Sequence, residues 1–143
     1  MRSYLIVANQ TLASPTLAEA VKDRLAQDTA RFHVVVPATP IQHGLTWDEG
    51  EAESAAQERL DGMLAWLRKL GAEAFGEVGN KDPIAAAQDA LRGNPVDEII
   101  LSMLPPGISR WLGQDVPSRL KGAVSVPVSV VTAPREPAST TQG

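Results

Sequence analysis

Two histidines and a run of carboxylates are the residues of this chain that first suggest metal binding or proton transfer. His33 and His43 have no second ligand at helical or turn spacing. The densest acidic stretch is Asp48, Glu49, Glu51 and Glu53. These carboxylates fall in the first turns of a predicted helix, where they complement its dipole and face solvent. We therefore expect no metal site, with His33 in a strand at the sheet margin and His43 in a loop.

Serine catalysis and phosphate loops lack their sequence signatures. Ser102 ends a predicted strand, but no G-x-S-x-G elbow surrounds it and no histidine is placed to activate it. Neither G-x-x-x-x-G-K-[ST] nor a G-x-G-x-x-G after the first strand is present. Gly76 and Gly79 form only a G-x-x-G, which recurs by chance. A phosphoacceptor receiver domain would need acidic residues where this chain has Asn9. The sequence predicts no catalytic residue.

Composition limits the class of protein. A chain of 143 residues and 15.2 kDa fits one domain with a single core. A net charge of −4 argues against a general nucleic-acid binder, and the absence of cysteine excludes disulfides and thiolate chemistry. No stretch reaches the roughly 18 apolar residues that span a bilayer, and residues 1–9 are too short an apolar run for a signal peptide. We expect a cytoplasmic protein with no nucleic-acid or membrane partner.

Five apolar segments alternate with helical patterns along the chain. The predicted strands are Tyr4–Ala8, Phe32–Val36, Ala72–Val78, Glu98–Ser102 and Val126–Val131. Ser14 and Asp82 each precede a proline, the pattern of an N-cap followed by the first helical position. After a predicted loop over residues 38–45, Thr46 and Glu49 form a capping box for the longest helix. This alternation predicts an α/β domain with a mainly parallel sheet.

The C-terminal third is expected to hold short helices and the last strand. Ile108–Leu112 and Val116–Lys121 have helical patterns. Pro127 cannot donate a hydrogen bond to the sheet, so it should lie at a strand start or on an edge. We expect one domain over residues 1–132 and a disordered, proline-rich tail over residues 133–143.

The carboxyl ends of parallel strands meet at one edge of the sheet, where open α/β sheets bind ligands. Any ligand site is therefore expected among the segments that follow the predicted strands. These segments are residues 9–11, 36–39, 79–82, 102–107 and 131–133.

The order and spacing of these elements resemble the universal stress protein family, within the adenine-nucleotide α-hydrolase-like group. That family ends its first strand in an Asp-Gly-Ser-like turn, where this chain has Asn9-Gln10-Thr11. The segment from Gly79 to Ile84 and the last strand are also similar. The resemblance covers nearly the whole chain and implies a three-layer α/β/α fold with strand order 3-2-1-4-5.

The family's nucleotide motif, G-x2-G-x9-G-[ST], has diverged here. Aligning residues 107–112 with the family's Gly-Leu-Arg-Arg segment places the three glycines at Leu101, Leu104 and Gln114, and the Ser or Thr at Asp115. In the family, the glycines let backbone N–H groups reach phosphates. Asp115, expected at a helix N-cap, should occupy those N–H groups and repel phosphates, by roughly 4 kcal/mol at 4 Å and an effective dielectric of 20.

We expect this chain to retain the part of the family's pocket that binds adenosine, although the phosphate motif has diverged. Asn9 has hydrogen-bonding groups for an adenine or ribose, and Val36 offers an apolar contact for a base. The resemblance thus implies a candidate pocket for ATP or AMP, formed by Asn9, Thr11, Val36, Ser102, Gly107, Gln114 and Asp115.

Arg110, Arg119 and Lys121 form a basic group in this acidic chain. One interpretation is an anion site beside the same crevice, formed by Arg110 and Arg119. The other is a solvated helix face on which Arg119 pairs with Asp115. Trp111 has two interpretations as well: an anchor for a partner, or a residue of the core or of a dimer.

Three functions fit the resemblance. The first is a non-catalytic stress-response or regulatory module that needs no cofactor, does not bind ATP tightly and contacts an unidentified protein partner. The second is a nucleotide-binding protein with a divergent phosphate cradle. The third is an enzyme acting on an adenylated substrate, for which no nucleophile or base is evident. Because family members commonly dimerise through the last strand, Val128 and Val130 are the predicted homodimer interface.

Overall fold

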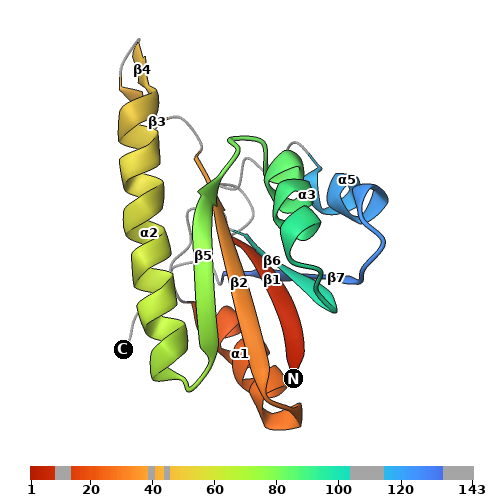
Figure 1. Cartoon of the computed structure of the whole chain (residues 1–143). Coiled ribbons are helices and arrows are strands. Elements are labelled where there is room, and N and C mark those ends of the chain that lie inside the picture. The colour runs from red at the N-terminus through yellow and green to blue at the C-terminus, as the bar shows by residue number, and fades with distance from the viewer. Residues whose placement is uncertain (9–13, 39–40, 44–45, 104–114, 134–143) are drawn as a thin grey trace.

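The computed structural model describes residues 1–8, 14–38, 41–43, 46–103 and 115–133. Its main element is a sheet of five parallel strands in the order β5-β2-β1-β6-β7 (Figure 1). Counted along the chain within this sheet, the order is 3-2-1-4-5, so the predicted order and the α/β class are confirmed. The strands are β1 (Arg2–Ala8), β2 (Ala30–Pro37), β5 (Glu73–Gly79), β6 (Glu98–Met103) and β7 (Val128–Thr132).

Helices cover both faces of the sheet, which gives three layers (Figure 1). Alternate side chains of β1 point to opposite faces: Tyr4 and Ile6 pack with α1 and α2, and Leu5 and Val7 pack with α3 and α5. No helix in the described part of the chain is both long enough and apolar enough to cross a membrane. The described helices are α1 (Pro15–Gln27), α2 (Glu49–Lys69), α3 (Pro83–Gly93) and α5 (Val116–Ala123).

Two of the predicted helix starts are confirmed by their capping contacts. The Ser14 hydroxyl accepts a hydrogen bond from the Leu17 N–H at 3.1 Å. The Asp82 carboxylate accepts one from the Ile84 N–H, also at 3.1 Å. In both helices a proline follows the cap, where the missing N–H has no intrahelical partner to lose.

The segment before α2 corrects three predictions. An antiparallel hairpin joins β3 (Ile41–His43) to β4 (Thr46–Asp48), so residues 41–43 are not a loop and His43 lies in a strand. Thr46 pairs with His43 in that hairpin instead of capping a helix, and α2 begins at Glu49. Thr and Trp favour strands. Pairing between the two strands also satisfies their backbone N–H and C=O groups, whereas a capping box would rely on the side chain of Thr46 to satisfy backbone groups at the helix start.

The last strand begins two residues later than predicted. The backbone N–H of Ile99 donates to the Pro127 carbonyl at 2.8 Å, and regular strand pairing starts at Val128. Pro127 therefore lies immediately before the first residue of β7, an edge strand, where its missing N–H interrupts no strand pairing. The predicted helical segment 108–112 and residues 134–143 of the predicted tail lie outside the described residues. The predicted domain boundary at residue 132 stays a prediction.

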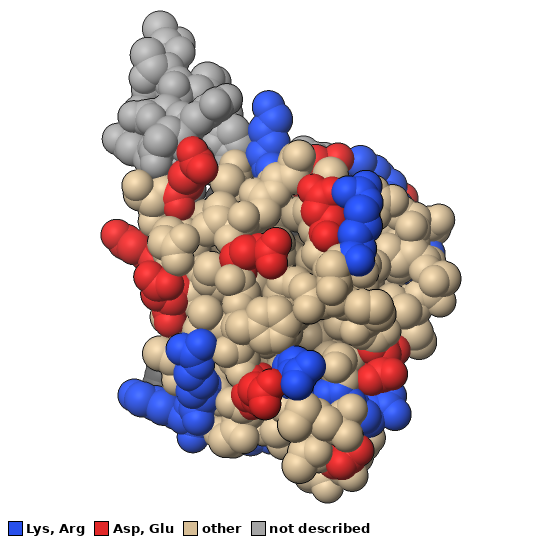
Figure 2. Space-filling view, in the orientation of Figure 1, with Lys and Arg blue, Asp and Glu red and all other residues tan. Residues whose placement is uncertain are grey.

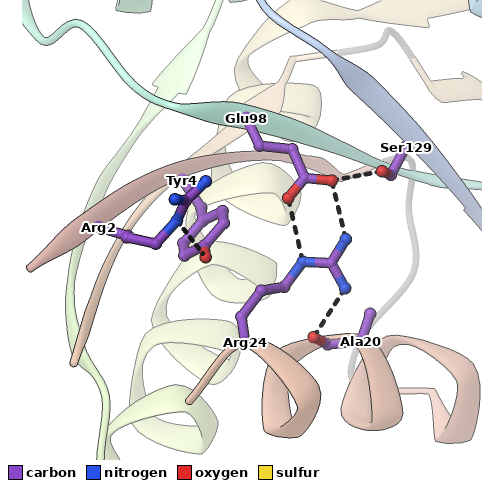
Figure 3. A network of polar contacts seen from close by, with 6 residues as sticks. All are labelled: Arg2, Tyr4, Ala20, Arg24, Glu98 and Ser129. Atoms are coloured by element: carbon purple, nitrogen blue, oxygen red, sulfur yellow. Dashed lines mark hydrogen bonds and ion pairs between the residues drawn. The ribbon is translucent and has the colours of Figure 1, made fainter. Parts of the chain in front are cut away.

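A partly buried carboxylate joins α1 to the two strands at one side of the sheet (Figure 3). Arg24 donates to both oxygens of Glu98, at 3.2 and 2.8 Å, and Ser129 donates to the same carboxylate. Arg24 also donates to the Ala20 carbonyl at 3.0 Å. The Arg24 and Glu98 side chains are 18% and 17% exposed. We call this group, Arg24, Glu98 and Ser129, the Glu98 clamp.

The pKa of Glu98 shows which forces act in the clamp. Burial by itself would raise this pKa, but the hydrogen bonds from Arg24 and Ser129 outweigh it, so the pKa lies below its ordinary value of 4.5. The same hydrogen bond to Glu98 raises the pKa of Arg24. At its other end, α1 is tied to β7 because the Thr16 hydroxyl donates to the Thr132 carbonyl at 2.9 Å. The helix is thus attached to β6 near one end, through Arg24, and to β7 near the other, through Thr16.

We predict that Glu98→Gln lowers the free energy of unfolding at pH 7 by about 1–3 kcal/mol, because hydrogen bonds to a charged group are lost. Glu98 has a depressed pKa in the fold, so its contribution is present above pH 4.5 and is lost as the pH falls below that value. The variant should therefore lose less stability than the wild type between pH 5 and pH 3. Urea unfolding followed by circular dichroism measures both effects.

The control is Glu73→Gln. Glu73 pairs with Arg31 at 2.6 Å, but the two side chains are 54% and 46% exposed. This change should cost no more than about 1 kcal/mol. Two outcomes would contradict the proposed contribution of the Glu98 clamp to stability. One is an equal loss of unfolding free energy in the two variants, and the other is a Glu98→Gln stability that falls between pH 5 and pH 3 as much as that of the wild type.

Candidate functional site

The carboxyl edge of the sheet has a switch point between β1 and β6. The connection after β1 leads to α1 on one face, and the connection after β6 leads toward α5 on the other face. Connections that diverge in this way leave a crevice between the two strand ends. Ala8 and Ser102 are direct partners in the register of these strands, so the two ends lie side by side. This is the edge at which the sequence predicts a ligand site.

The structure places two of the predicted pocket residues beneath this edge. Val36 lies one residue beyond the Val7–Val35 pair, and Ser102 lies opposite Ala8, so Val36 and Ser102 lie in the same row, on either side of Ala8. Val36 is 2% exposed and Ser102 is 1% exposed. Both side chains are thus buried at the carboxyl ends of their strands, and their role in a site stays a prediction. The predicted site residues Asn9, Thr11, Gly107, Arg110 and Gln114, and the flanking Leu104 and Trp111, lie outside the described residues.

Asp115 occupies the N-cap of α5, as predicted, but its geometry is different from the expected one. Its backbone has φ 55° and ψ 40°, in the left-handed region, and its side chain makes no capping hydrogen bond. The expectation that its carboxylate occupies the first N–H groups of the helix is therefore wrong. N-cap side chains normally reach those groups from an extended backbone, and the left-handed conformation directs the carboxylate elsewhere. The side chain is exposed.

The predicted pairing of Arg119 with Asp115 is also wrong. Within the described residues neither side chain takes part in an ion pair, and the link between the two residues is the ordinary helical bond from the Arg119 N–H to the Asp115 carbonyl, at 3.1 Å. Because α5 joins the parallel strands β6 and β7, its N-terminus lies toward the carboxyl edge of the sheet. Asp115 thus brings a negative charge that no cation of the described residues pairs with to the side where the ligand site is expected.

The surface charge shows no extended pattern on the face drawn in Figure 2. Acidic and basic side chains are interspersed there, and the middle of the face has few charges. A phosphate backbone needs a continuous basic path, which this face does not offer. The predicted absence of a nucleic-acid partner stays a prediction.

Sequence reasoning missed a polar group on the opposite half of the sheet. His33 lies in β2, which is an interior strand and not the sheet margin, and is 2% exposed. Its Nε2 lies 2.7 Å from the Glu77 carboxylate, and its ring stacks on Phe75 with centroids 4.6 Å apart. His33 and Glu77 are 44 positions apart, and only the register of β2 with β5 brings them together. No local motif could have indicated this pair.

The G-x-x-G at Gly76 and Gly79 has a packing role. A Cβ atom on Gly76 would collide with the Val34 carbonyl oxygen and lie 2.7 Å from a Leu60 methyl carbon of α2. A Cβ atom on Gly79 would lie 2.6 Å from a Val35 methyl carbon and 3.0 Å from the Ala86 side chain of α3. The two glycines let helices approach β5 closely from opposite faces.

Comparison with known proteins shows which solved structures share the fold of this chain. No family model and no curated protein matches this chain. Among solved structures, the universal stress protein from Archaeoglobus fulgidus is 19% identical, with a TM-score of 0.59 over 92% of this chain and 93% of that chain. A universal stress protein family protein from Arabidopsis thaliana with AMP bound is 9% identical, with a TM-score of 0.63 over 94% and 93% of the two chains.

A third match is the Archaeoglobus fulgidus protein in complex with dAMP, 18% identical, with a TM-score of 0.59 over 92% of this chain and 98% of that chain. The chain is therefore an α/β protein with a five-stranded parallel sheet, and its fold is that of the universal stress protein structures. Identities this low establish the shared fold alone.

We predict that Gly76→Ala destabilises the protein by about 1–3 kcal/mol, because the added methyl group overpacks the contact between β5 and α2. The matched control is Gly122→Ala in α5, where an added Cβ meets nothing within 4 Å. That change should be neutral or stabilise by up to about 1 kcal/mol, since alanine favours helix more than glycine does. Thermal or urea unfolding compares the two, and a tolerated Gly76→Ala would contradict the packing role.

Proposed function

We propose that this chain is a regulatory module of the universal stress protein type that is non-catalytic and does not bind ATP tightly. The shared fold, over more than nine-tenths of this chain and of the matched chains, supports the class. The single observation that carries the second part is Asp115 at the N-cap of α5, exposed, without a capping bond and without an ion pair among the described residues.

The electrostatic cost depends on how many phosphates a ligand carries. A carboxylate 4 Å from one phosphate charge opposes binding by about 1 kcal/mol in water and about 4 kcal/mol at an effective dielectric of 20. A triphosphate brings several such charges toward the N-terminus of α5, whereas a monophosphate brings fewer. Asp115 therefore disfavours ATP more than AMP.

A second candidate function is binding of a nucleoside monophosphate, or of ATP through a divergent cradle. Two of the matched structures are described with AMP and with dAMP bound, which favours this ligand class for the same fold. In the described part of α5, Arg119 is a cation without a carboxylate partner, one turn from Asp115. In this second candidate function, Arg119 is the partner of a single phosphate at that end.

We predict that the wild-type protein binds ATP more weakly than AMP, and that Asp115→Asn raises its ATP affinity by about tenfold, corresponding to about 1.4 kcal/mol. Asparagine keeps the size of the side chain and tolerates the left-handed backbone, so only the charge is removed. Titration calorimetry with ATP, ADP and AMP, each with and without Mg²⁺, measures the affinities, and a phosphate-release assay measures hydrolysis.

Glu58→Gln, an exposed carboxylate of α2, is the control that changes net charge equally. It should leave all three affinities unchanged. Tight ATP binding or ATP hydrolysis by the wild type would overturn the proposal. An ATP affinity that does not rise in Asp115→Asn would show that this carboxylate is not the obstacle.

We further propose that the module forms a homodimer through β7. This strand lies at an edge of the sheet, so one side of its backbone pairs with no strand among the described residues. Val130 is 39% exposed, and the only other exposed large apolar residue in the described part of the chain is Met1. Val128 is partly buried against the core that α3 and α5 cover. An apolar edge strand avoids open-ended pairing when a second copy covers it.

We predict that Val130→Lys weakens this dimer by at least about tenfold, because a charge is placed on its apolar centre. Sedimentation velocity over a concentration series measures the change. Ala65→Lys, on the exposed surface of α2, adds the same charge far from β7 and should leave the dimer intact. A wild type that is monomeric at high concentration, or an unchanged dimer in Val130→Lys, would contradict the proposed interface.

A further inference from the structure

β5 is one edge of the sheet, and the outer side of its backbone pairs with no strand among the described residues. Figure 1 shows β5 in front of β2, with α2 on one side and α3 on the other. The Ala38 N–H, which follows β2, donates to the Gly79 carbonyl at 3.2 Å, so Gly79 directs its backbone groups toward β2. Successive residues of a strand direct these groups to opposite sides. Gly76 and Val78 therefore present their N–H and C=O groups at the outer edge.

Arg68 of α2 marks where the open part of this edge begins. Its guanidinium donates to the Ala74 carbonyl at 2.8 Å, and Ala74 is the outward-facing residue that precedes Gly76. That carbonyl already has a donor, which opposes strand pairing at Ala74. Gly76 has no side chain to obstruct an approaching backbone. The open part of the edge therefore runs from Gly76 to Val78.

An aromatic ring borders the open edge on the α3 side. A Cβ atom on Gly76 would meet Leu60 of α2, so the neighbouring side chains of β5 point to the other face, that of α3. Phe75 is one of them, and it is only partly buried and packs in neither of the two apolar cores. Its ring stacks on His33 of β2 with centroids 4.6 Å apart, which is close to the spacing of neighbouring strands. The other face of the ring is therefore directed past the edge of the sheet.

Glu77 gives this side of the edge a negative charge. Its side chain is 53% exposed, and His33 engages one of its oxygens at 2.7 Å, which leaves the second oxygen to accept from a cation. Glu73, two residues earlier in β5, is already paired with Arg31 at 2.6 Å. Within the described residues, Glu77 is thus the carboxylate of β5 that no arginine balances.

Asp61 brings a second carboxylate to the α2 side of the edge. Because Arg68 reaches the outward-facing carbonyl of Ala74, the stripe of α2 that contains Arg68 lies beside the edge. Leu64 and Asp61 precede Arg68 by four and seven residues, so they belong to the same stripe. Leu64 is partly buried, whereas Asp61 is exposed and forms no ion pair with another described residue. A segment on this edge would therefore lie between two carboxylates.

We propose that the open edge of β5 binds an extended, basic segment of another protein, which enlarges the sheet by one strand. The main chain of that segment pairs with Gly76 and Val78, as in other complexes in which a peptide adds to a sheet edge. Arginine side chains on its α3 side contact the Phe75 ring and the Glu77 carboxylate. β7 and the carboxyl edge of the sheet take no part, so this site is independent of the proposed dimer and of any nucleotide.

The probe is a fluorescein-labelled peptide, Thr-Arg-Val-Arg-Val-Arg-Thr, in which the arginines share one face of an extended chain. The matched control peptide has glutamate in place of each arginine. Fluorescence anisotropy with the full-length protein should show saturable binding of the arginine peptide and at least about tenfold weaker binding of the glutamate peptide. Equal affinities, or no binding of the arginine peptide, would overturn the proposal.

Amide hydrogen exchange, followed by NMR, locates the bound peptide. In the free protein, the outward N–H groups of Gly76 and Val78 should exchange faster than those of Phe75 and Glu77, which face β2. The arginine peptide should slow exchange at Gly76 and Val78 by at least about tenfold. Unchanged exchange at these two positions would exclude the site. Slow exchange there in the free protein would exclude it as well, because a second copy or another segment of this chain would already cover the edge.

Val78→Pro removes an outward N–H and no bond to β2, so the affinity for the arginine peptide should fall at least about tenfold. The matched control, Val78→Ala, loses the same side chain but keeps the N–H, and its affinity should stay within about threefold of the wild type. If Val78→Pro does not fold, Glu77→Gln keeps an acceptor for His33 without the charge and should weaken binding by at least about threefold. Glu58→Gln, on the exposed surface of α2, should leave binding unchanged. Undiminished affinity in folded Val78→Pro or in Glu77→Gln would refute the site.

Discussion

The position of α1 against β6 and β7 depends on the Glu98 clamp. Glu98 is taken largely out of water, which is unfavourable for a carboxylate unless hydrogen bonds compensate. Arg24 and Ser129 supply those bonds from a helix and from the edge strand, so three elements are fixed through one side chain. Glu98 lies at the amino-terminal end of β6, so the clamp fixes the same strand whose other end, at Ser102, lies beside Ala8 at the carboxyl edge.

Three carboxylates in this chain show how the environment decides what a negative charge does. Glu98 is compensated by Arg24 and stabilises the fold. Glu77 is half-exposed and orients the His33 ring. Asp115 has neither a capping bond nor an ion pair within the described residues, so its charge acts on whatever approaches α5. The net charge of −4 therefore does not indicate which ligands bind. The effect of each carboxylate is determined by the groups that it contacts.

The features that sequence predicted well are those with local causes. Apolar runs such as Tyr4–Ala8 became fully buried strands, and cap-plus-proline pairs at Ser14 and Asp82 became helix starts. Thr46 misled the prediction because its β-hairpin pairing with His43 outweighs a local capping pattern. The contact between His33 and Glu77 needed the register of two strands, and the left-handed backbone of Asp115 has no signature in its neighbours.

Fold and function are specified by different residues in this protein. The sheet requires only that apolar side chains alternate between two helix-covered faces, and that β5 carry small residues where α2 and α3 approach. Many sequences meet these conditions, so identities of 9–19% are compatible with TM-scores near 0.6. A phosphate site is more demanding, because one carboxylate at the N-terminus of one helix opposes an anion without disturbing the sheet. The fold can therefore persist while its ligand changes, and the charge at Asp115 is the feature through which that change would act.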